Sequence, residues 1–200
     1  MTEDAPVLEL HGRAMRHSVV VVSLIGDDQW DAPTPCADWT IRDLLTHMTT
    51  ENRGFAAAAL GETTSRDAWT DRPFSDDPRR DYAMSADEVV TAFADPAPEF
   101  WLPNINETFR FPATQAIGFH LLDYVVHTWD VAASLGRTVA LEDDLVAAAQ
   151  EIADRDVPDG ERRRRPGAGF QPPVKVSGEA TPLAHLLAFL GRDTSPPPRI

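Results

Sequence analysis

The 200-residue sequence has one cysteine, few basic residues for its number of acids, and no long hydrophobic run. A single cysteine, Cys36, excludes an intrachain disulfide and fits the reducing conditions of the cytoplasm. The amino terminus lacks the basic segment that opens a secretory signal peptide. No stretch approaches the roughly 18 apolar residues of a membrane span. The sequence therefore predicts a cytoplasmic protein.

Basic residues are scarce: 18 Lys and Arg stand against 32 Asp and Glu, a formal net charge of −14. Such a chain repels phosphate backbones and anionic lipid surfaces, so we expect neither a nucleic acid nor a membrane as partner. Most acids fall in predicted loops and helix starts, and we expect the functional site itself to be close to neutral. No Gly-x-Ser-x-Gly sequence is present, which leaves an α/β-hydrolase triad without support.

Strand-like alternation is nearly absent, and apolar residues recur at helical spacing. Thr40 and Asp43 have the spacing of a capping box at the start of the second helix, which Gly61 ends. Residues 62–84 are predicted to be a long loop, residues 107–111 a short extended piece, and residues 158–180 a second loop. Helices are predicted over residues 7–26, 41–60, 85–94, 112–135, 142–154 and 182–190.

This pattern predicts an all-α bundle with a long crossover between the second and third helices and extra short helices near the C-terminus. We expect one domain over residues 1–194 and a disordered tail over residues 195–200, which contain three prolines.

The predicted helix over residues 112–135 carries polar side chains at steps of three and four residues, which places them in one stripe. A solvated face is one explanation. However, the stripe has no Lys, Glu or Arg, and imidazoles and short carboxylates are typical metal ligands. Both interpretations remain open. The residues of the stripe are His120, Asp123, His127, Asp130 and Ser134.

Asp123 and His127 lie four residues apart, so their side chains can converge on one ion. The best candidate for a third ligand is His47 in the second helix, which is flanked by apolar residues; a core histidine is the alternative. Two histidines and one carboxylate leave coordination positions open for water or substrate, as catalytic metal sites do.

Other residues near this set have open roles. His120, one turn before Asp123, is predicted to be a fourth ligand, an outer group or a proton carrier. Asp130 either orients His127 or is a surface acid. Asp43 and Glu51, on either side of His47, are expected to be exposed helical acids.

Cys36 is either a nucleophile or, more simply, a structural residue in a Pro-rich turn. Residues Arg162–Arg165 either clamp an anionic substrate or form a solvated loop. The sequence suggests no partner for His11, His17 or His185.

Three segments of the chain resemble one family. Residues 34–47, TPCADWTIRDLLTH, resemble the second-helix entry of the mycothiol-dependent maleylpyruvate isomerase N-terminal (DinB-like) superfamily. Residues 120–132, HLLDYVVHTWDVA, resemble its second metal motif. Residues 182–193, PLAHLLAFLGRD, resemble the C-terminus of a short actinobacterial branch described as metal-binding proteins.

The resemblance implies a DinB-like four-helix bundle that holds a divalent metal, usually zinc and otherwise nickel or iron, through His47, Asp123 and His127. Many relatives have Glu in place of Asp123, one methylene longer, which bears on the metal's identity. In the superfamily the metal activates a low-molecular-weight thiol such as mycothiol, because a metal-bound thiol loses its proton near neutral pH. The isomerase also has a second domain, for which this chain is too short.

Three hypotheses follow. The first is a metal-dependent enzyme that transfers a small thiol or isomerises a substrate through a thiol adduct, with His120 and Asp130 as catalytic residues. The second is a non-catalytic metal-binding or stress-related protein, which acids clustered around the metal would favour. The third is a metal-free bundle that serves as an interaction module. The expected partners are a small-molecule substrate and a small thiol, and a homodimer stays open.

Overall fold

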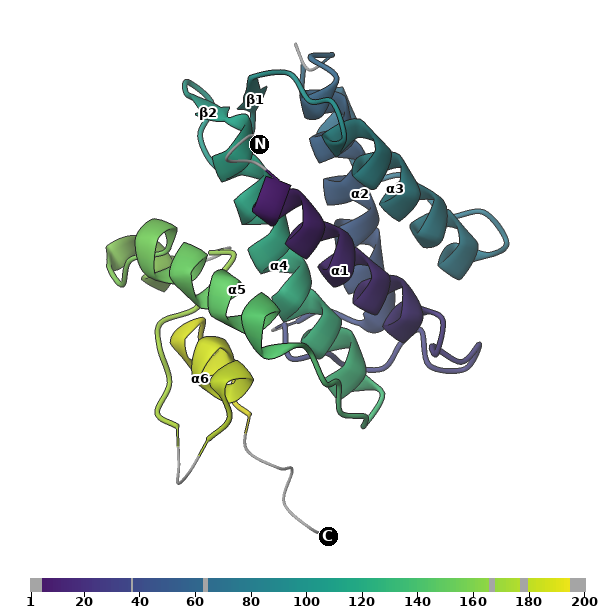
Figure 1. The fold of residues 1–200 in the computed structure, drawn as a ribbon. Helices are drawn as coiled ribbons and strands as arrows, with labels where there is room; N and C mark the ends of the chain where they lie inside the picture. The colour runs from purple at the N-terminus through teal and green to yellow at the C-terminus, as the bar shows by residue number, and fades with distance from the viewer. Residues whose placement is uncertain (1–4, 37, 63–64, 166–167, 177–179, 195–200) are drawn as a thin grey trace, which may run out of the picture. The chain divides into compact units, whose positions relative to one another are not determined.

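The computed structural model describes residues 5–36, 38–62, 65–165, 168–176 and 180–194. It contains two compact units, Met1–Val139 and Ala140–Ile200. The fold is all-α, as predicted, with one small two-stranded sheet (Figure 1). None of the described helices combines the length and hydrophobicity needed to cross a membrane. The helices are α1 Ala5–Val22, α2 Ile41–Ala59, α3 Pro78–Phe93, α4 Ala113–Ser134, α5 Asp143–Asp156 and α6 Pro182–Phe189, with short 3-10 turns η1 Arg66–Trp69 and η2 Glu161–Arg164.

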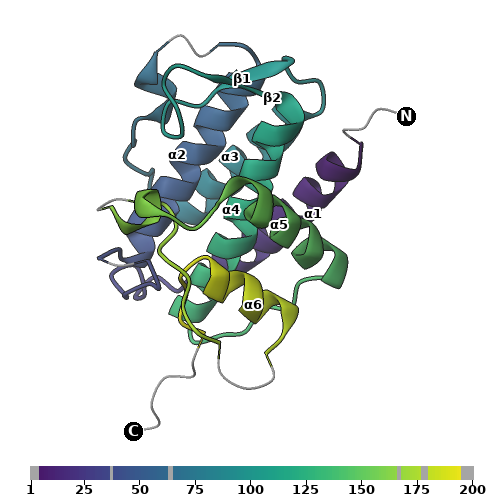
Figure 2. The ribbon, with the colours of Figure 1, turned by 90° about the vertical axis from the view of Figure 1, so that its left-hand side faces the viewer.

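The first unit is a four-helix bundle in which α1 and α2 each pack against both α3 and α4 (Figures 1 and 2). Arg79, at the start of α3, donates a hydrogen bond of 2.6 Å to the carbonyl of Ile25, so α3 begins where α1 ends. In Figure 1, α2 and α3 therefore run in one direction and α1 and α4 in the other. Parallel neighbours require a long connection, which confirms the predicted crossover.

The described part of that connection, residues 60–62 and 65–77, runs back along α2 and covers one side of it. Trp69 lies against Gly54 in the last turns of α2, and the hydroxyl of Thr50 donates to Asp71 at 2.9 Å. Residues 71–75 then reach Arg42 and Thr46 near the start of the helix. The crossover thus forms one wall beside the middle of α2, where His47 lies.

The start of α2 follows the prediction closely. The side chain of Thr40 accepts from the backbone N–H of Asp43, and Asp43 accepts from the backbone N–H of Thr40 in return. Gly61, with a φ of +72°, follows the last turn in the left-handed region that favours glycine. Asp43 is exposed, as expected, and its bonds to Thr40 hold the pKa of its carboxyl below the usual value. The capping box fixes the first turn of α2, and hence the face on which His47 emerges.

Three predicted boundaries are wrong. The third helix begins at Pro78, not near residue 85, because Asp77 caps the N–H of Arg80 and Pro78 occupies the first turn. The first helix ends at Val22 rather than Gly26, whose N–H turns instead to the side chain of Gln29.

The third boundary is that of the short extended piece. The strand is β2, Arg110–Pro112, and not residues 107–111. It pairs antiparallel with β1, Glu99–Trp101, which supplies the partner that a strand needs.

The second unit contains α5 and α6, which pack against each other. The prediction of a solvated loop for Arg162–Arg165 is wrong for Arg163, which is buried and donates to the backbone carbonyls of Gln171 and Phe189. The predicted disordered tail, residues 195–200, lies outside the described residues, and the single domain over residues 1–194 stays a prediction.

The core of the bundle contains a pair of buried histidines from α1 and α4. The Nε2 atom of His11 lies 2.9 Å from Nδ1 of His120, and His120 stacks on the ring of Tyr124. Burial lowers the pKa of His11 to about 3 and that of His120 well below its ordinary value. Both imidazoles are therefore neutral, and one donates to the other. A partner for His11 could not be seen in the sequence because His120 is far away along the chain.

The close contact between α2 and the crossover gives a prediction for Gly54→Ala. A Cβ atom there would lie 2.6 Å from Cδ2 of Trp69, whereas at Gly12 in α1 the nearest neighbour would be the flexible end of Arg16 at 3.6 Å. We expect Gly54→Ala to lower the free energy of unfolding by about 1–3 kcal/mol. Gly12→Ala should leave it equal or raise it by up to about 1 kcal/mol. Urea unfolding measures both, and equal stability of the two variants would contradict the tight packing.

The histidine pair predicts a loss of stability in acid. Below the unfolded-state pKa of 6.5, the unfolded chain takes up protons that the buried, neutral His11 refuses down to about pH 3. The free energy of unfolding should therefore fall with decreasing pH by about 1.4 kcal/mol per pH unit for this residue. His11→Gln should reduce the slope by that amount between pH 6 and pH 4, in urea titrations. The exposed His185→Gln is the control, and an unchanged slope for His11→Gln would refute the assignment.

Candidate metal centre

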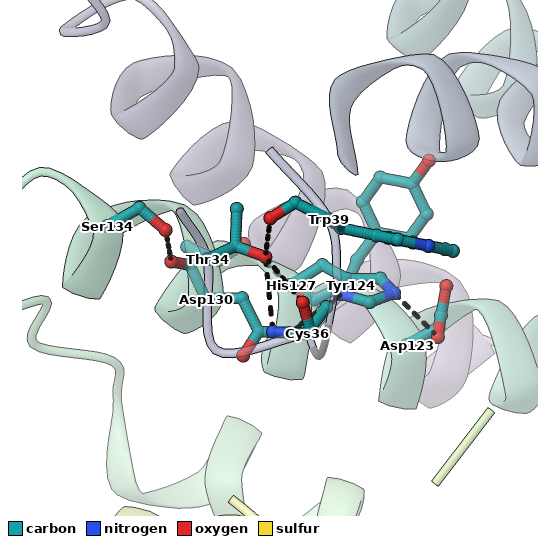
Figure 3. Close-up of polar contacts among 9 residues, drawn as sticks. Thr34, Cys36, Trp39, Asp123, Tyr124, His127, Asp130 and Ser134 are labelled. Carbon is teal, nitrogen blue, oxygen red and sulfur yellow. Dashed lines mark hydrogen bonds and ion pairs between the residues drawn. The ribbon is translucent and has the colours of Figure 1, made fainter. Parts of the chain in front are cut away.

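The three predicted ligands come together between α2 and α4. The rings of His47 and His127 meet edge to face with centroids 5.3 Å apart, and Nε2 of His127 lies 3.4 Å from Oδ1 of Asp123 (Figure 3). One ligand atom from each of His47, Asp123 and His127 lies within 4.8 Å of the others. The folded chain therefore brings together the two sequence motifs, one leading into α2 and the other in α4.

The donor set suits a divalent ion. Nitrogen and oxygen ligands of a tetrahedral ion lie about 3.3 Å apart, given bonds of about 2.0 Å. His47 and Asp123 are only partly buried, so their side chains have room to close the remaining distance. Their exposure also leaves the site reachable from solvent. Two imidazoles and one carboxylate with open positions are typical of catalytic rather than structural metal sites.

Asp130 lies behind His127. Its carboxylate is fully buried, and Oδ2 lies 2.9 Å from Nδ1 of His127. When Nδ1–H donates to this oxygen, the lone pair of the neutral ring is on Nε2, the atom near Asp123. The solvated-face explanation of the α4 stripe is therefore wrong for the buried His120, His127 and Asp130. Asp123 and Ser134, the other two residues of the stripe, are partly exposed.

The two histidines of the set differ in charge. Burial, and then the nearby charge of His127, lowers the pKa of His47 to about 4. Burial also lowers the pKa of His127, but the charge of Asp123 and the hydrogen bond that the ring donates to Asp130 outweigh it and raise that pKa well above the ordinary value. His127 therefore carries a positive charge between the carboxylates of Asp123 and Asp130. A bound metal cation can replace that charge.

Glu51 contradicts its prediction as an exposed helical acid. It is partly buried one turn after His47, and Nδ2 of Asn104 donates to its Oε1 at 3.1 Å. Burial, and then the charge of Asp123, raises the pKa of its carboxyl to about 8. Asp71 also acts on both His47 and Glu51. The expectation of a nearly neutral site is therefore wrong, since the carboxylates of Asp71, Asp123 and Asp130 outnumber the positive charge of His127 even though Glu51 keeps its proton.

Cys36 lies next to the ligand set, a position that the sequence did not indicate when it offered the residue only as a nucleophile or a structural cysteine. Its Sγ lies 3.3 Å from Oδ2 of Asp130, to which the thiol donates, and 4.0 Å from Nδ1 of His127. The loop before α2 brings the thiol there, although more than 90 residues separate it from His127 and Asp130. The only sequence signal was its place within the resembling segment at residues 34–47.

His120 does not join this group in the structure. Its ring lies with His11 and Tyr124 in the core, and neither candidate ligand group among the described residues contains it. Its role as a proton carrier stays a prediction. Trp39, by contrast, covers the site, with its ring 5.0 Å from that of His47.

A pocket of about 390 Å³ opens beside the site, between the start of α2 and the crossover. Arg42 and Arg72 bring positive charge to it, Phe74 an apolar face, and Asp71 links it to His47 and Glu51. Arg42 also lies 5.5 Å from the ring of Trp30, which restrains its guanidinium.

Two relatives of the chain align with almost its whole length. Two proteins of Mycobacterium tuberculosis, from strains CDC 1551 / Oshkosh and ATCC 25618 / H37Rv and both described as uncharacterized, are each 30% identical to the chain. Each alignment covers 191 residues, 92% of this chain and 97% of the relative. No solved structure matches the chain.

A family match covers the bundle that carries the site. Residues 12–132 match the mycothiol maleylpyruvate isomerase N-terminal domain, a span that includes His47, Asp123, His127 and Asp130. The match covers more than half of the chain. The protein therefore belongs to the mycothiol maleylpyruvate isomerase N-terminal domain family.

Proposed function

We propose that this protein is a divalent-metal-dependent enzyme that activates a low-molecular-weight thiol of the mycothiol type, for transfer to an electrophile or for isomerisation of a thiol adduct. The observation that carries the proposal is the convergence of His47, Asp123 and His127, from two helices, at a place reachable from solvent. Membership of a family named for mycothiol supports the choice of thiol.

His47, Asp123 and His127 would hold the ion, preferably zinc, and the bound ion would supply the Lewis acidity that lowers the pKa of a thiol. Asp130 positions His127 by accepting its Nδ1–H. Glu51, whose carboxyl is largely protonated at neutral pH, can hold a proton at the edge of the site. The electrophile would enter through the pocket beside Asp71, where the ring of Phe74 and two guanidinium groups suit a small organic anion.

The carboxylates favour a second candidate, a metal-binding protein without catalysis. Glu51, Asp71 and Asp130 lie around the ligand set in addition to Asp123. Carboxyl groups beyond those that a catalytic site requires would help the protein to retain a cation. Thiol dependence separates this candidate from the enzyme.

The first test is metal affinity. We expect one zinc ion per chain, a loss of binding in His127→Ala, and an affinity about 10–100-fold lower in Asp130→Asn, because outer hydrogen bonds set the basicity of a ligating imidazole. Competition with a chelator measures the affinity, and circular dichroism confirms that each variant folds. The exposed His185→Ala is the matched control. A wild-type protein that binds no divalent ion would leave only the interaction module, and a His127→Ala variant that binds as well as the wild type would refute this ligand set.

The second test is thiol binding. Mycothiol should bind the zinc-loaded protein and not the metal-stripped protein in isothermal titration calorimetry. The analogue with serine in place of its cysteine should bind far more weakly, because its hydroxyl does not ionise near neutral pH. A chlorodinitrobenzene then reports whether the bound thiol reacts faster than the free one. Zinc binding without any effect of mycothiol would favour the non-catalytic candidate.

A further inference from the structure

The Nδ1 edge of the His127 ring carries a second set of ligand atoms. Sγ of Cys36, Nδ1 of His127 and Oδ2 of Asp130 lie 4.0, 2.9 and 3.3 Å apart in pairs (Cys36–His127, His127–Asp130 and Cys36–Asp130). A tetrahedral ion with bonds of about 2.3 Å to sulfur and about 2.0 Å to nitrogen and oxygen holds such atoms about 3.3–3.5 Å apart. Each pair therefore needs to change by about half an ångström or less. Figure 3 shows Cys36 and Asp130 beside the ring of His127.

The loop that carries Cys36 is held in place by its own hydrogen bonds. The hydroxyl of Thr34 contacts both Cys36 and Trp39, accepting from the N–H of Cys36 at 3.1 Å and lying 3.0 Å from the carbonyl oxygen of Trp39. The N–H of Trp39 donates to the carbonyl of Cys36 at 3.1 Å. His127 and Asp130 are buried in α4, whereas Cys36 is partly exposed. The donors are thus arranged in advance, and an ion can reach them from the loop side.

We propose that Cys36, His127 and Asp130 form a second metal site, which takes a thiophilic divalent ion of the zinc type. A thiolate, an imidazole and a carboxylate together suit zinc and softer ions, whereas the first set has no sulfur. The site stands on this geometry and does not depend on the thiol chemistry proposed above.

The two sites share His127 and exclude each other. Binding at the second site releases two protons to solvent, the thiol proton of Cys36 and the Nδ1 proton of the positively charged His127, so that the thiolate and the lone pair of Nδ1 can bind the ion. The proton that remains on the ring is then on Nε2, where Oδ1 of Asp123, 3.4 Å away, accepts it. A neutral imidazole has only one lone pair, so His127 can no longer serve the first site. A thiophilic ion bound to Cys36 therefore takes His127 away from the first site, which keeps only His47 and Asp123 as ligands.

Titration of the full chain with Co²⁺ tests the second site, because a cobalt–thiolate bond absorbs strongly in the near ultraviolet and nitrogen or oxygen ligands alone do not. In His47→Ala, which lacks a ligand of the first site only, we expect this absorption with one Co²⁺ per chain. Adding Cys36→Ser to His47→Ala should abolish the absorption. Circular dichroism of the metal-free variants establishes that both are folded. A folded His47→Ala variant without the absorption would overturn the proposal.

The Cys36→Ser variant separates this proposal from the proposed function. It should still bind one ion through the first site, without the thiolate absorption and with the mycothiol dependence of the wild type. The wild-type protein should bind one Co²⁺ and not two. Two ions bound at once, with thiolate absorption, would overturn the mutual exclusion. Retained ion binding in Cys36→Ser together with no thiolate absorption in any variant would reject the second site while leaving the proposed function intact.

Discussion

The hydrogen bond between His127 and Asp130 is the interaction on which the site depends. Both residues are buried in α4 three residues apart, and the bond decides which nitrogen of the imidazole keeps its lone pair. With Nδ1–H directed to Asp130, Nε2 faces His47 and Asp123. When Nδ1 instead binds an ion, the ring becomes a ligand of the proposed second site, together with Cys36. One proton position thus selects between two sets of ligands without any movement of the helices.

The helical bundle made this arrangement largely predictable. Thr40 and Asp43 fix the start of α2, so the position of His47 follows from the local sequence. The spacing of Asp123, His127 and Asp130 along α4 also follows from the turn of one helix. The apolar flanks of His47 made it the best candidate for a third ligand and the family resemblance supported that choice, but its contact with His127 depends on how two helices pack. The start of α3 could have been predicted from the sequence, because an N-cap such as Asp77 and a first-turn proline such as Pro78 are ordinary signals of a helix beginning.

The rest of the site could not be predicted because it depends on contacts between distant segments. Cys36 meets α4 through a loop whose path is set by bonds from Thr34, and nothing in the spacing of the residues indicates that contact. Glu51 has the sequence surroundings of a solvent-facing acid, yet Asn104 and Asp123 meet it from other parts of the chain. The net charge misled in the same way, because an average over the chain says little about where four carboxyl groups gather.

The crossover between α2 and α3 has a consequence for how such a protein can change. The ligands sit on helices whose positions are fixed by the packing of the core, whereas Asp71, Arg72 and Phe74 sit on the segment that lines the neighbouring pocket. Substitutions in that segment can alter the size and charge of what enters and leave the coordinating atoms where they are. In the proposed enzyme, the fold therefore keeps reactivity and selectivity on separate stretches of chain, so that one can diversify while the other is retained.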